Sequence, residues 1–532
     1  MNATSDLHAN ATLSGFDQPH RTRLGRVLLF KGVTVEDFAT TMTRIAQARI
    51  RRFERAAKRH YDEMEREARR ANSGISRTSY SKPKSWSFRK DFNPFIVRAR
   101  ADVYAHGIGQ SLKNKTYSVG APYVFNVEKP QGGSRTITSF GIPDEALSRR
   151  IYRSLMGKNL GALSGRSYAY RADINVFDAI AYISSEWRDH PRLFVAEYDL
   201  QDYFGSVDHR YLFRQMEMLN LRMTPRERLV MEAFLGVPNT GRSSGFPQGT
   251  SISLFLSGIA LSPLDRALER LNVGFARFSD DILLWGADYA AVRAGVDMLF
   301  EWSNESKVGI SKSKSRGLQI LSPAGVIGGS EIRDVDSVEF LSHKISLRSV
   351  GLARRPERDI RQRISRLIYA NLLRQPLAKT QNLARLANGV DRDYLTLLSQ
   401  LRRLLYGGLS EHQVLRFSRS GYVPLTHLTG FVARHPVVTE EGNWRDFDRW
   451  LRRQIWLALR RRARLLRKTG FAGSCIPWGV PVHMLSSQSY RSKRTSFLLN
   501  MKVPSATRMA CVVRKATELH GTRVTERPRG IY

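Results

Sequence analysis

The pattern of apolar and polar positions divides the chain into a helical beginning, a mixed middle and a helical end. Residues 35–72 contain no Gly or Pro and place apolar residues at near-helical spacing among many Arg and Glu residues, which predicts a long, charged helix. Pro and Ser residues between 77 and 87 interrupt this pattern, and a second helical pattern covers 93–112. We therefore expect a helical region over residues 1–115.

The middle of the chain has a different pattern. From Tyr117 to about Ile345, short apolar runs of strand length alternate with helical segments, which predicts an α+β domain. Beyond Arg348 the sequence is again helical and becomes strongly basic, up to an Arg-rich helix that ends at residue 468.

The composition is that of a folded and very basic protein. Of the 532 residues 42% are hydrophobic, which is enough for more than one hydrophobic core. The 85 Lys and Arg residues against 48 Asp and Glu residues give a net charge of +37. Such an excess repels itself unless a polyanion neutralises it, so nucleic acid is favoured as a partner over an acidic membrane surface.

Cysteine content and apolar run length bear on the cellular compartment. The two cysteines, Cys475 and Cys511, are too few for a disulfide framework or a thiolate zinc site, which favours a reducing compartment. The apolar runs are too short to span a bilayer, and residues 1–16 lack the basic-then-apolar pattern of a secretion signal. We expect a cytoplasmic protein that makes no membrane contact.

Two segments of the middle region place carboxylates where they could act together. In LFVAEYD (193–199) apolar and polar positions alternate, so a half-buried strand would present Asp199 at its end. By itself, an Asp in such a place is more often a turn or helix-capping residue. In GFARFSDDILLWG (274–286) two apolar runs flank Asp280 and Asp281, which predicts a hairpin with an acidic tip.

These carboxylates would suit divalent cations. Neighbouring carboxylates at a tight turn repel each other, and a cation relieves that repulsion. With Asp199 alongside, the set offers oxygen ligands to two Mg²⁺ ions, for which Mn²⁺ can substitute, and two ions about 4 Å apart can hold both ends of an in-line phosphoryl displacement. A third segment, GFPQGTSIS (245–253), predicts a glycine-fixed turn before a helix, with Gln248 as a candidate contact to substrate or template.

In this order, the three segments resemble the palm motifs of reverse transcriptases. DLQDYFGSVDH, which starts at Asp199, resembles the first motif, GFPQG the second and FSDD the third. The flanking segments 134–155 and 168–180 resemble the fingers motifs of bacterial group II intron and retron-like enzymes. Downstream, GISKSKSR and VEFLSHKIS (338–346) resemble the lysine-bearing motif and the primer-grip hairpin.

The resemblance covers residues 117–346 and implies an α+β right-hand polymerase fold, with a helical N-terminal extension and a basic helical C-terminal one. The implied divisions are the helical N-terminal region 1–115, fingers 116–185, palm 186–346, helical thumb 347–415 and basic helical C-terminal region 416–532.

The resemblance also implies roles for individual residues. Asp199, Asp280 and Asp281 would be catalytic metal ligands, and Leu200 would offer its backbone carbonyl. The residues implied to contact substrate are Phe204, Gln248, Arg135, Arg171 and Lys314. Phe204 would be the steric gate that excludes a ribose 2′-hydroxyl, the two arginines would hold the triphosphate, and the lysine, with Lys312 as the alternative, would approach the pyrophosphate.

The Arg-rich segment 449–468 contains nine basic residues and no acidic one. On a helix, its apolar residues form one stripe, made of Leu451, Ile455, Leu459 and Leu466. The segment could be a solvated helix packed on the thumb or a membrane-surface helix. In a polymerase that must hold nucleic acid by its phosphates, RNA or template-primer binding is the third interpretation. The candidate contacts are Arg460, Arg461, Arg462 and Arg464.

The implied function is that of an RNA-directed DNA polymerase. Its partners would be an RNA template or a dedicated non-coding RNA, the DNA product and dNTPs, with a homo-oligomer left open. Phe278, Ser279 and Leu254 depart from the usual motifs, and no retron-specific motif, nuclease domain or RNase H carboxylate set is recognisable. These departures suggest a stand-alone bacterial enzyme of the abortive-infection or phage-defence kind.

Two other functions remain as alternatives. An RNA-dependent RNA polymerase shares the palm and the acidic pair, but the Pro-Gln-Gly motif and Phe204 favour DNA synthesis. A catalytically silent RNA-binding palm protein would not need the intact carboxylate set. The sequence leaves open the template, the mode of priming and the number of subunits.

Overall fold

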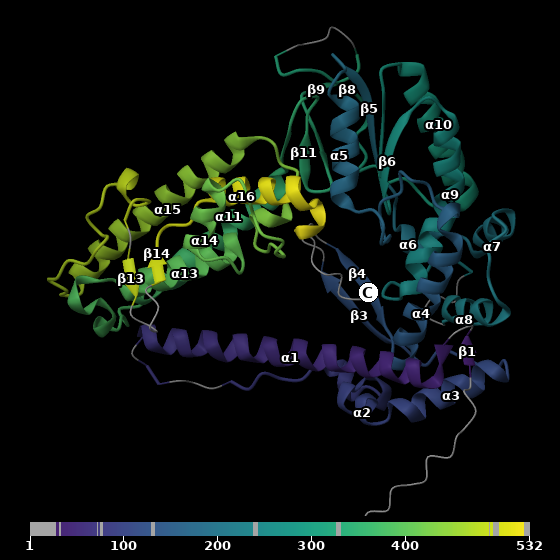
Figure 1. Cartoon of the computed structure of the whole chain (residues 1–532), viewed down its shortest axis with the longest axis horizontal. Coiled ribbons are helices and arrows are strands. Elements are labelled where there is room, and N and C mark those ends of the chain that lie inside the picture. Colours follow the sequence, from purple (N-terminus) through teal and green to yellow (C-terminus); the bar gives the residue numbers. More distant parts are fainter. Residues whose placement is uncertain are drawn as a thin grey trace, which may run out of the picture.

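The structure of the chain is a computed structural model (Figure 1). It describes residues 28–30, 33–71, 73–74, 78–128, 133–237, 243–325, 331–488, 490–492 and 499–525. The segment 1–16, for which we expect no secretion signal, lies outside the described residues.

A five-stranded sheet with the strand order β6-β7-β5-β8-β9 lies at the centre of the middle region. Its strands are β5 (Leu193–Asp199), β6 (Gly274–Phe278), β7 (Asp281–Gly286), β8 (Gly317–Leu321) and β9 (Asp334–Val335). All neighbouring pairs are antiparallel except β8 and β9, which are parallel. The predicted strand 193–199 and the predicted hairpin 274–286 are therefore both present.

Both faces of this sheet are covered. Successive side chains of a strand point to opposite sides, and those of β7 enter two different hydrophobic cores. On β7, Ile282 and Leu284 belong to one hydrophobic core, whereas Leu283 and Trp285 belong to another. The first core includes α4 (Ile142–Asn159), α7 (His209–Met218), α8 (Pro225–Leu235), α9 (Ser251–Arg270) and α10 (Tyr289–Ser306). The second includes α5 (Val176–Trp187) and a small sheet of β10 (Val338–Phe340), β11 (His343–Ile345) and β12 (Val350–Leu352).

In the described part of the N-terminal region, both segments with a helical pattern form helices. The expected helix over 35–72 is α1 (Val35–Ala71), and its first half packs into the core around α4. The second helical pattern forms two helices, α2 (Pro94–Ala99) and α3 (Ala101–Lys113), because Arg100 between them has non-helical backbone angles (φ −123°, ψ 27°). The short pair β1 (Leu28–Phe30) and β2 (Val33–Thr34) precedes α1, and the hairpin of β3 (Tyr123–Glu128) and β4 (Ser134–Ser139) follows α3.

The region after β12 has a core of its own, with buried residues from Leu352 to Val524. Its helices are α11 (Arg354–Ile368), α12 (Arg374–Leu377), α13 (Arg392–Tyr406), α14 (Glu411–Arg419), α15 (Glu441–Lys468) and α16 (Ala506–His520), and its strands are β13 (Tyr490–Ser492) and β14 (Leu499–Met501). The regions predicted as thumb and C-terminal extension share this core, and their boundary stays a prediction. None of the helices in the described part of the chain is long and apolar enough to cross a membrane.

Candidate active site

The catalytic carboxylates predicted from the sequence meet at one edge of the central sheet. Asp199 is the last residue of β5 and Asp281 the first of β7, and the two are direct partners in the antiparallel register. Asp280 lies in the turn before β7, and its carbonyl accepts a hydrogen bond of 3.2 Å from the Leu200 N–H. The fold therefore brings together all four residues that were predicted as metal ligands.

The turn that carries Asp280 is held in place by buried polar groups. Ser279 has a left-handed backbone conformation (φ 62°), and its hydroxyl accepts a hydrogen bond from the Tyr170 hydroxyl at 3.1 Å. Its carbonyl accepts one from Nη1 of Arg277 at 3.2 Å. Arg277 is fully buried and forms an ion pair with Asp265, with N–O distances of 2.5 and 2.7 Å.

The buried pair of Arg277 and Asp265 was missed by the sequence analysis. A signal was present, because each is the single charged residue in an otherwise apolar stretch, GFARF on β6 and LSPLD on α9. A charge at such a position is retained in a fold when it has a buried partner.

The carboxylates influence each other electrostatically. Loss of water around the carboxyl group, followed by the negative charges of Asp280 and Asp199, raises the pKa of Asp281 to about 7, although part of this residue reaches solvent. Burial, and then the charge of Asp199, also raises the pKa of Asp280. Both shifts reflect carboxylates that are costly to ionise together without a cation.

Lys314 provides one positive charge at this place. Its Nζ lies 2.8 Å from Oδ1 and 2.9 Å from Oδ2 of Asp199. The same segment binds the end of β5 through its backbone, since the Ser311 N–H donates to the Asp199 carbonyl at 2.8 Å and the Asp199 N–H donates to Oγ of Ser315 at 3.2 Å. The lysine in contact with the catalytic carboxylate is therefore Lys314.

The oxygen ligands are of the kind that Mg²⁺ prefers, but in this structure Asp199 is bound to Lys314. Among the described residues, no three His, Cys, Asp or Glu side chains are close enough together to hold a metal ion. Asp199, Asp280 and Asp281 with the Leu200 carbonyl nevertheless form an all-oxygen set of the type that Mg²⁺ prefers. Closing this set around a cation requires Lys314 to move away from Asp199.

Phe204 lies beside the site in a cluster of aromatic side chains. It is half-buried in the short helix α6 (Tyr203–Ser206), and its ring makes edge contacts with Tyr170 and Phe246 at centroid distances of 6.3 and 6.1 Å. The Phe246 N–H donates to the Phe204 carbonyl at 2.6 Å. Gly245 has φ +85°, and a Cβ there would lie 2.8 Å from the carbonyl oxygen of Gly205, so only glycine fits this close approach.

The Pro-Gln-Gly turn also binds the β3–β4 hairpin. The carbonyl of Gln248 accepts a hydrogen bond of 2.8 Å from the Thr138 N–H of β4. Gly249 has φ +135°, and a Cβ there would lie 2.3 Å from the Thr138 carbonyl oxygen. This turn is thus fixed between α6 and β4, which places Gln248 at the junction of the predicted palm and fingers.

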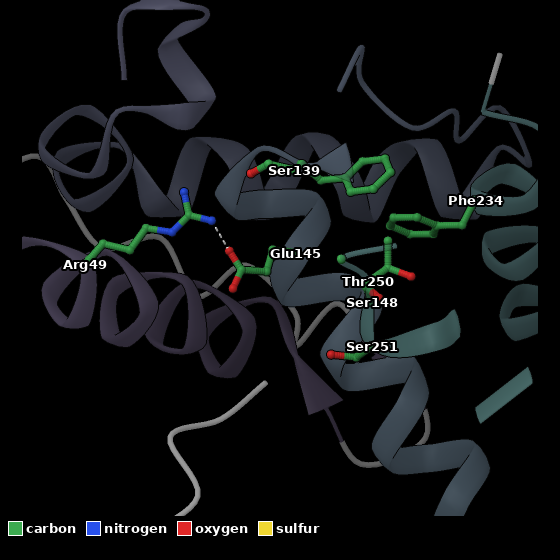
Figure 2. A pocket seen from close by; sticks show the side chains of 9 residues that line it. Arg49, Ser139, Glu145, Ser148, Phe234, Thr250 and Ser251 are labelled. Carbon is green, nitrogen blue, oxygen red and sulfur yellow. Dashed lines mark hydrogen bonds and ion pairs between the residues drawn. The ribbon is translucent and has the colours of Figure 1, made fainter. Parts of the chain in front are cut away.

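A small polar cavity lies behind this turn (Figure 2). Its volume is about 110 Å³, and it is lined by Arg49, Ser139, Phe140, Glu145, Ser148, Phe234, Gly249, Thr250 and Ser251. Small-molecule sites usually measure roughly 300 Å³ or more. The cavity is therefore too small for a nucleotide.

The two arginines that were predicted to hold triphosphate differ in exposure. Arg135 is exposed on β4, opposite Val127, and its predicted contact stays a prediction. Arg171 needs correction, because it is buried, its Nε and Nη2 bind Asp173 at 3.1 and 2.5 Å, and its Nη1 binds the Ser164 carbonyl at 2.6 Å. Each nitrogen of its guanidinium is occupied, so Arg171 supports the fold locally and is not free for substrate.

The four arginines of α15 that were predicted to contact nucleic acid also differ in exposure. Arg460, Arg461 and Arg464 are exposed. Arg462 is fully buried, with Nε 2.7 Å from Asp391 and Nη2 2.8 Å from Asp393. The prediction that Arg462 binds RNA is therefore wrong.

A central sheet with carboxylates at a hairpin turn and at the end of the adjacent strand is the palm of a nucleotide polymerase. The family described as "Reverse transcriptase (RNA-dependent DNA polymerase)" matches residues 127–345, a range that includes the three carboxylates, Phe204, Gln248 and Lys314. The chain thus contains a domain of the reverse transcriptase type over these residues. The predicted α+β, right-hand polymerase class is confirmed.

Among solved structures, the chain is distantly similar to telomerases. For telomerase from Candida albicans in complex with a TWJ fragment of telomeric RNA, the TM-score is 0.35 at 12% identity, over 68% of this chain and 66% of that chain. For apo telomerase from Candida tropicalis the TM-score is 0.35 at 12% identity, over 65% and 66% of the two chains. This chain thus spans slightly less than two thirds of the length of these telomerase chains. Comparison with curated proteins gives no match.

Proposed function

We propose that the protein is an RNA-directed DNA polymerase that extends a primer with dNTPs by a two-metal-ion transfer. The observation that carries the proposal is the direct pairing of Asp199 with Asp281 across β5 and β7, with Asp280 in the adjoining turn. Together with the Leu200 carbonyl, these carboxylates would hold the ions, with Mg²⁺ as the natural cation and Mn²⁺ as a substitute.

Bound divalent ions would supply activation of the primer 3′-hydroxyl and neutralise the charge that develops on the departing pyrophosphate. The residues of the chain do the rest. Asp281, with a pKa of about 7, must give up its proton to act as a ligand. Lys314, whose side chain is 55% exposed, can leave Asp199 and place its ammonium group against the triphosphate.

Sugar selection is assigned to Phe204. Its ring projects from the segment directly after Asp199 and is supported by Tyr170 and Phe246, so it is a fixed wall next to the carboxylates. A fixed aromatic ring excludes a 2′-hydroxyl by contact. This wall favours DNA synthesis over the RNA-dependent RNA polymerase alternative, and the complete carboxylate set argues against a silent RNA-binding protein.

The test is dNTP incorporation on a primed RNA template by the double variant Asp280→Ala, Asp281→Ala. Loss of two ligands should abolish synthesis, since each ligand is worth several kcal/mol of transition-state stabilisation by rough estimate. Folding should be unaffected, because the variant removes carboxylates that repel each other. The control variant Glu301→Ala, Glu305→Ala removes two carboxylates from α10 and should retain activity. Full activity of the Asp280, Asp281 variant contradicts the proposal.

The proposed partners are an RNA template or a dedicated non-coding RNA, the DNA product and dNTPs, in the cytoplasm, with a homo-oligomer left open. We further propose a bacterial role in antiviral defence, supported by the resemblance to divergent stand-alone enzymes. Bacteria that express the wild type should resist phage plating, whereas bacteria that express the Asp280, Asp281 variant should not. Equal efficiency of phage plating on the two strains would contradict the defence role and leave the polymerase assignment intact.

A further inference from the structure

Helix α1 joins two parts of the molecule that are far apart in the sequence (Figure 1). Its first half, up to Ile50, is buried against α2, α3 and α4. There Arg49 forms an ion pair with Glu145 of α4, next to the cavity behind the Pro-Gln-Gly turn (Figure 2). The remaining turns leave this core and extend to the helical region that follows β12.

The far end of α1 is capped by a residue of that helical region. The backbone N–H of Asn382 donates to the Arg70 carbonyl at 2.8 Å, and its Nδ2 donates to the Arg69 carbonyl at 3.0 Å. Carbonyls in the last turn of a helix otherwise have no partner within the helix. Glu67 also forms an ion pair with Arg374 of α12, and Arg70 is only 2% exposed. We call this set of contacts the α1 latch.

The charges of α1 are segregated along its length. Between residues 51 and 59 one acidic residue, Glu54, accompanies the exposed basic residues Arg51, Arg52, Arg55, Lys58 and Arg59. Within the described residues, the ion pair recorded for this group is a long one, 3.9 Å from Lys58 to Asp62. By contrast, Arg66 and Arg69 are paired with Glu63 and Glu65. The middle of α1 is therefore a concentrated, uncompensated positive surface.

This surface lies on the side of α1 that the segment 78–86 leaves uncovered. One side of α1 is covered by the segment 78–86, where Tyr80 and Trp86 contact the Phe53 ring at centroid distances of 5.5 and 5.2 Å. Arg55 lies about 200° around the helix from Phe53 and hence on the opposite side. Figure 1 shows the segment 78–86 on the side of α1 away from the β3–β4 hairpin and the helices after β12. The exposed residues Arg51, Arg55 and Arg59 therefore lie on the side of α1 away from the segment 78–86.

We propose that α1 is a nucleic-acid-binding bridge: Arg51, Arg55 and Arg59 bind the phosphodiester backbone of a strand that runs along α1, and the α1 latch keeps the bridge in place during synthesis. Cations fixed on a helix that is anchored at both ends neutralise phosphates and release counterions with little loss of side-chain order. The source of the strand rests on the proposed function, whereas the binding itself does not.

The first test is a salt titration of binding by the variant Arg51→Gln, Arg55→Gln, Arg59→Gln, with single-stranded RNA, single-stranded DNA and an RNA–DNA hybrid as probes. The log-log slope should decrease in magnitude by roughly two to three, and affinity at moderate salt should fall roughly ten- to hundredfold. The probe with the largest change identifies the bound strand. The control variant Arg214→Gln, Arg228→Gln, Arg293→Gln removes the same charge from α7, α8 and α10 and should leave the slope unchanged. Equal slopes for the two variants overturn the proposal. Because binding is measured without synthesis, the result can be read even if the protein incorporates no dNTP.

The second test opens the α1 latch with Asn382→Asp. This variant keeps the Oδ1 that accepts from the Ala384 N–H, but loses the Nδ2 donor and puts a negative charge at the negative end of α1. Amide exchange in the last turn of α1 should accelerate, and products made in one binding event, with excess competitor present, should become shorter. Addition of the first nucleotide should be unchanged. Arg374→Gln, which removes the ion pair with Glu67, should act in the same direction. Wild-type amide exchange and product length in both variants would refute the α1 latch.

Discussion

Lys314 forms an ion pair with Asp199 at the candidate active site, and its Nζ lies within 2.9 Å of both carboxylate oxygens. Asp199 also faces Asp281 across two neighbouring strands. The negative charge of Asp199 is thus balanced by the partly exposed ammonium group of Lys314. In the proposed mechanism, a divalent ion would compete with this ammonium group for Asp199, and the released ammonium group would then be available to the triphosphate.

Replacing Lys314 by Met tests this relationship, since Met keeps an unbranched stem and removes the charge. Synthesis should fall roughly 10- to 100-fold, because one charge opposite the triphosphate is lost in the transition state. The free energy of unfolding should change by no more than about 1 kcal/mol, as the pair is half-exposed and screened by solvent. Steady-state incorporation and thermal melting measure the two effects. Lys312→Met is the control, and an equal loss of activity there would contradict the specific role of Lys314.

Phe204 should determine which sugar is accepted. Shrinking it to Val opens the space next to the 2′ position, so the preference for dNTPs over rNTPs should drop by about 10- to 100-fold. Competition between the two nucleotides on one primed template measures this ratio. An unchanged ratio with good dNTP incorporation would place sugar selection at another residue. A preference of the wild type for rNTPs would instead favour the RNA polymerase alternative.

The parts of the fold that the sequence predicts are those with a regular pattern. The helix expected over 35–72 is present as Val35–Ala71, and the acidic hairpin tip lies between β6 and β7. Both follow from local periodicity and turn chemistry. The strand that ends at Asp199 was expected to be half-buried, but both of its faces are buried, with Ala196 in one core and Val195 in another, and it is paired with a strand at each edge. A single strand pattern contains no information about how many partners flank it.

Roles that depend on distant partners could not be predicted in this way. Arg171 and Arg462 were assigned to ligands because each lies in a motif or a basic run, and both are satisfied by carboxylates of the protein. For Arg462 a local signal existed: with Ile455, Leu459 and Leu466 it follows the spacing of the buried stripe of α15. For Arg171 the partner Asp173 lies only two residues away, but the burial that excludes substrate arises from the folded chain.

Two buried histidines should make the protein sensitive to mild acid. His343 of β11 and His435 lie with their rings 5.4 Å apart. Burial lowers the pKa of His343 to about 4, and burial followed by the charge of His343 and Arg434 lowers the pKa of His435 to about 3. Both are neutral in the folded protein, while an unfolded His gains its proton near pH 6.5. Stability is therefore fully present above about pH 6.5 and is lost as the pH falls toward 4, by about 1.4 kcal/mol per pH unit for each His.

Urea unfolding at several pH values checks this sensitivity. In the variant His343→Phe, His435→Phe the unfolding free energy should decline less steeply between about pH 6.5 and 4, because the loss contributed by the two histidines is removed. His106→Phe, at an exposed position of α3, should leave the decline as in the wild type. If the double variant and the wild type lose stability in parallel, other groups determine the acid response.

The arginines of α15 should separate into one that holds the fold and three that bind nucleic acid. Arg462 is enclosed with Asp391 and Asp393. In Arg462→Gln, Asp393 keeps its ion pair with Arg385, but the buried Asp391 loses its cation, which should cost about 3–5 kcal/mol of unfolding free energy. Arg460, Arg461 and Arg464 are exposed, and Arg460 stacks on Trp456 with its Cζ 4.8 Å from the ring centroid. Replacing these three by Gln keeps helix propensity and should change stability by no more than about 0.5 kcal/mol for each site.

The same three changes should weaken binding of RNA or of a template-primer duplex and flatten its salt dependence, by about 0.9 in log-log slope for each duplex phosphate contact that is lost. Catalysis on saturating template-primer should suffer less, because the palm is untouched. Thermal melting and a salt titration of both variants decide the assignment. If the triple variant binds nucleic acid as tightly as the wild type, α15 is a solvated helix packed on the thumb and not a nucleic-acid contact. If wild-type protein binds RNA weakly but binds anionic liposomes well, the membrane-surface interpretation of this helix would replace it.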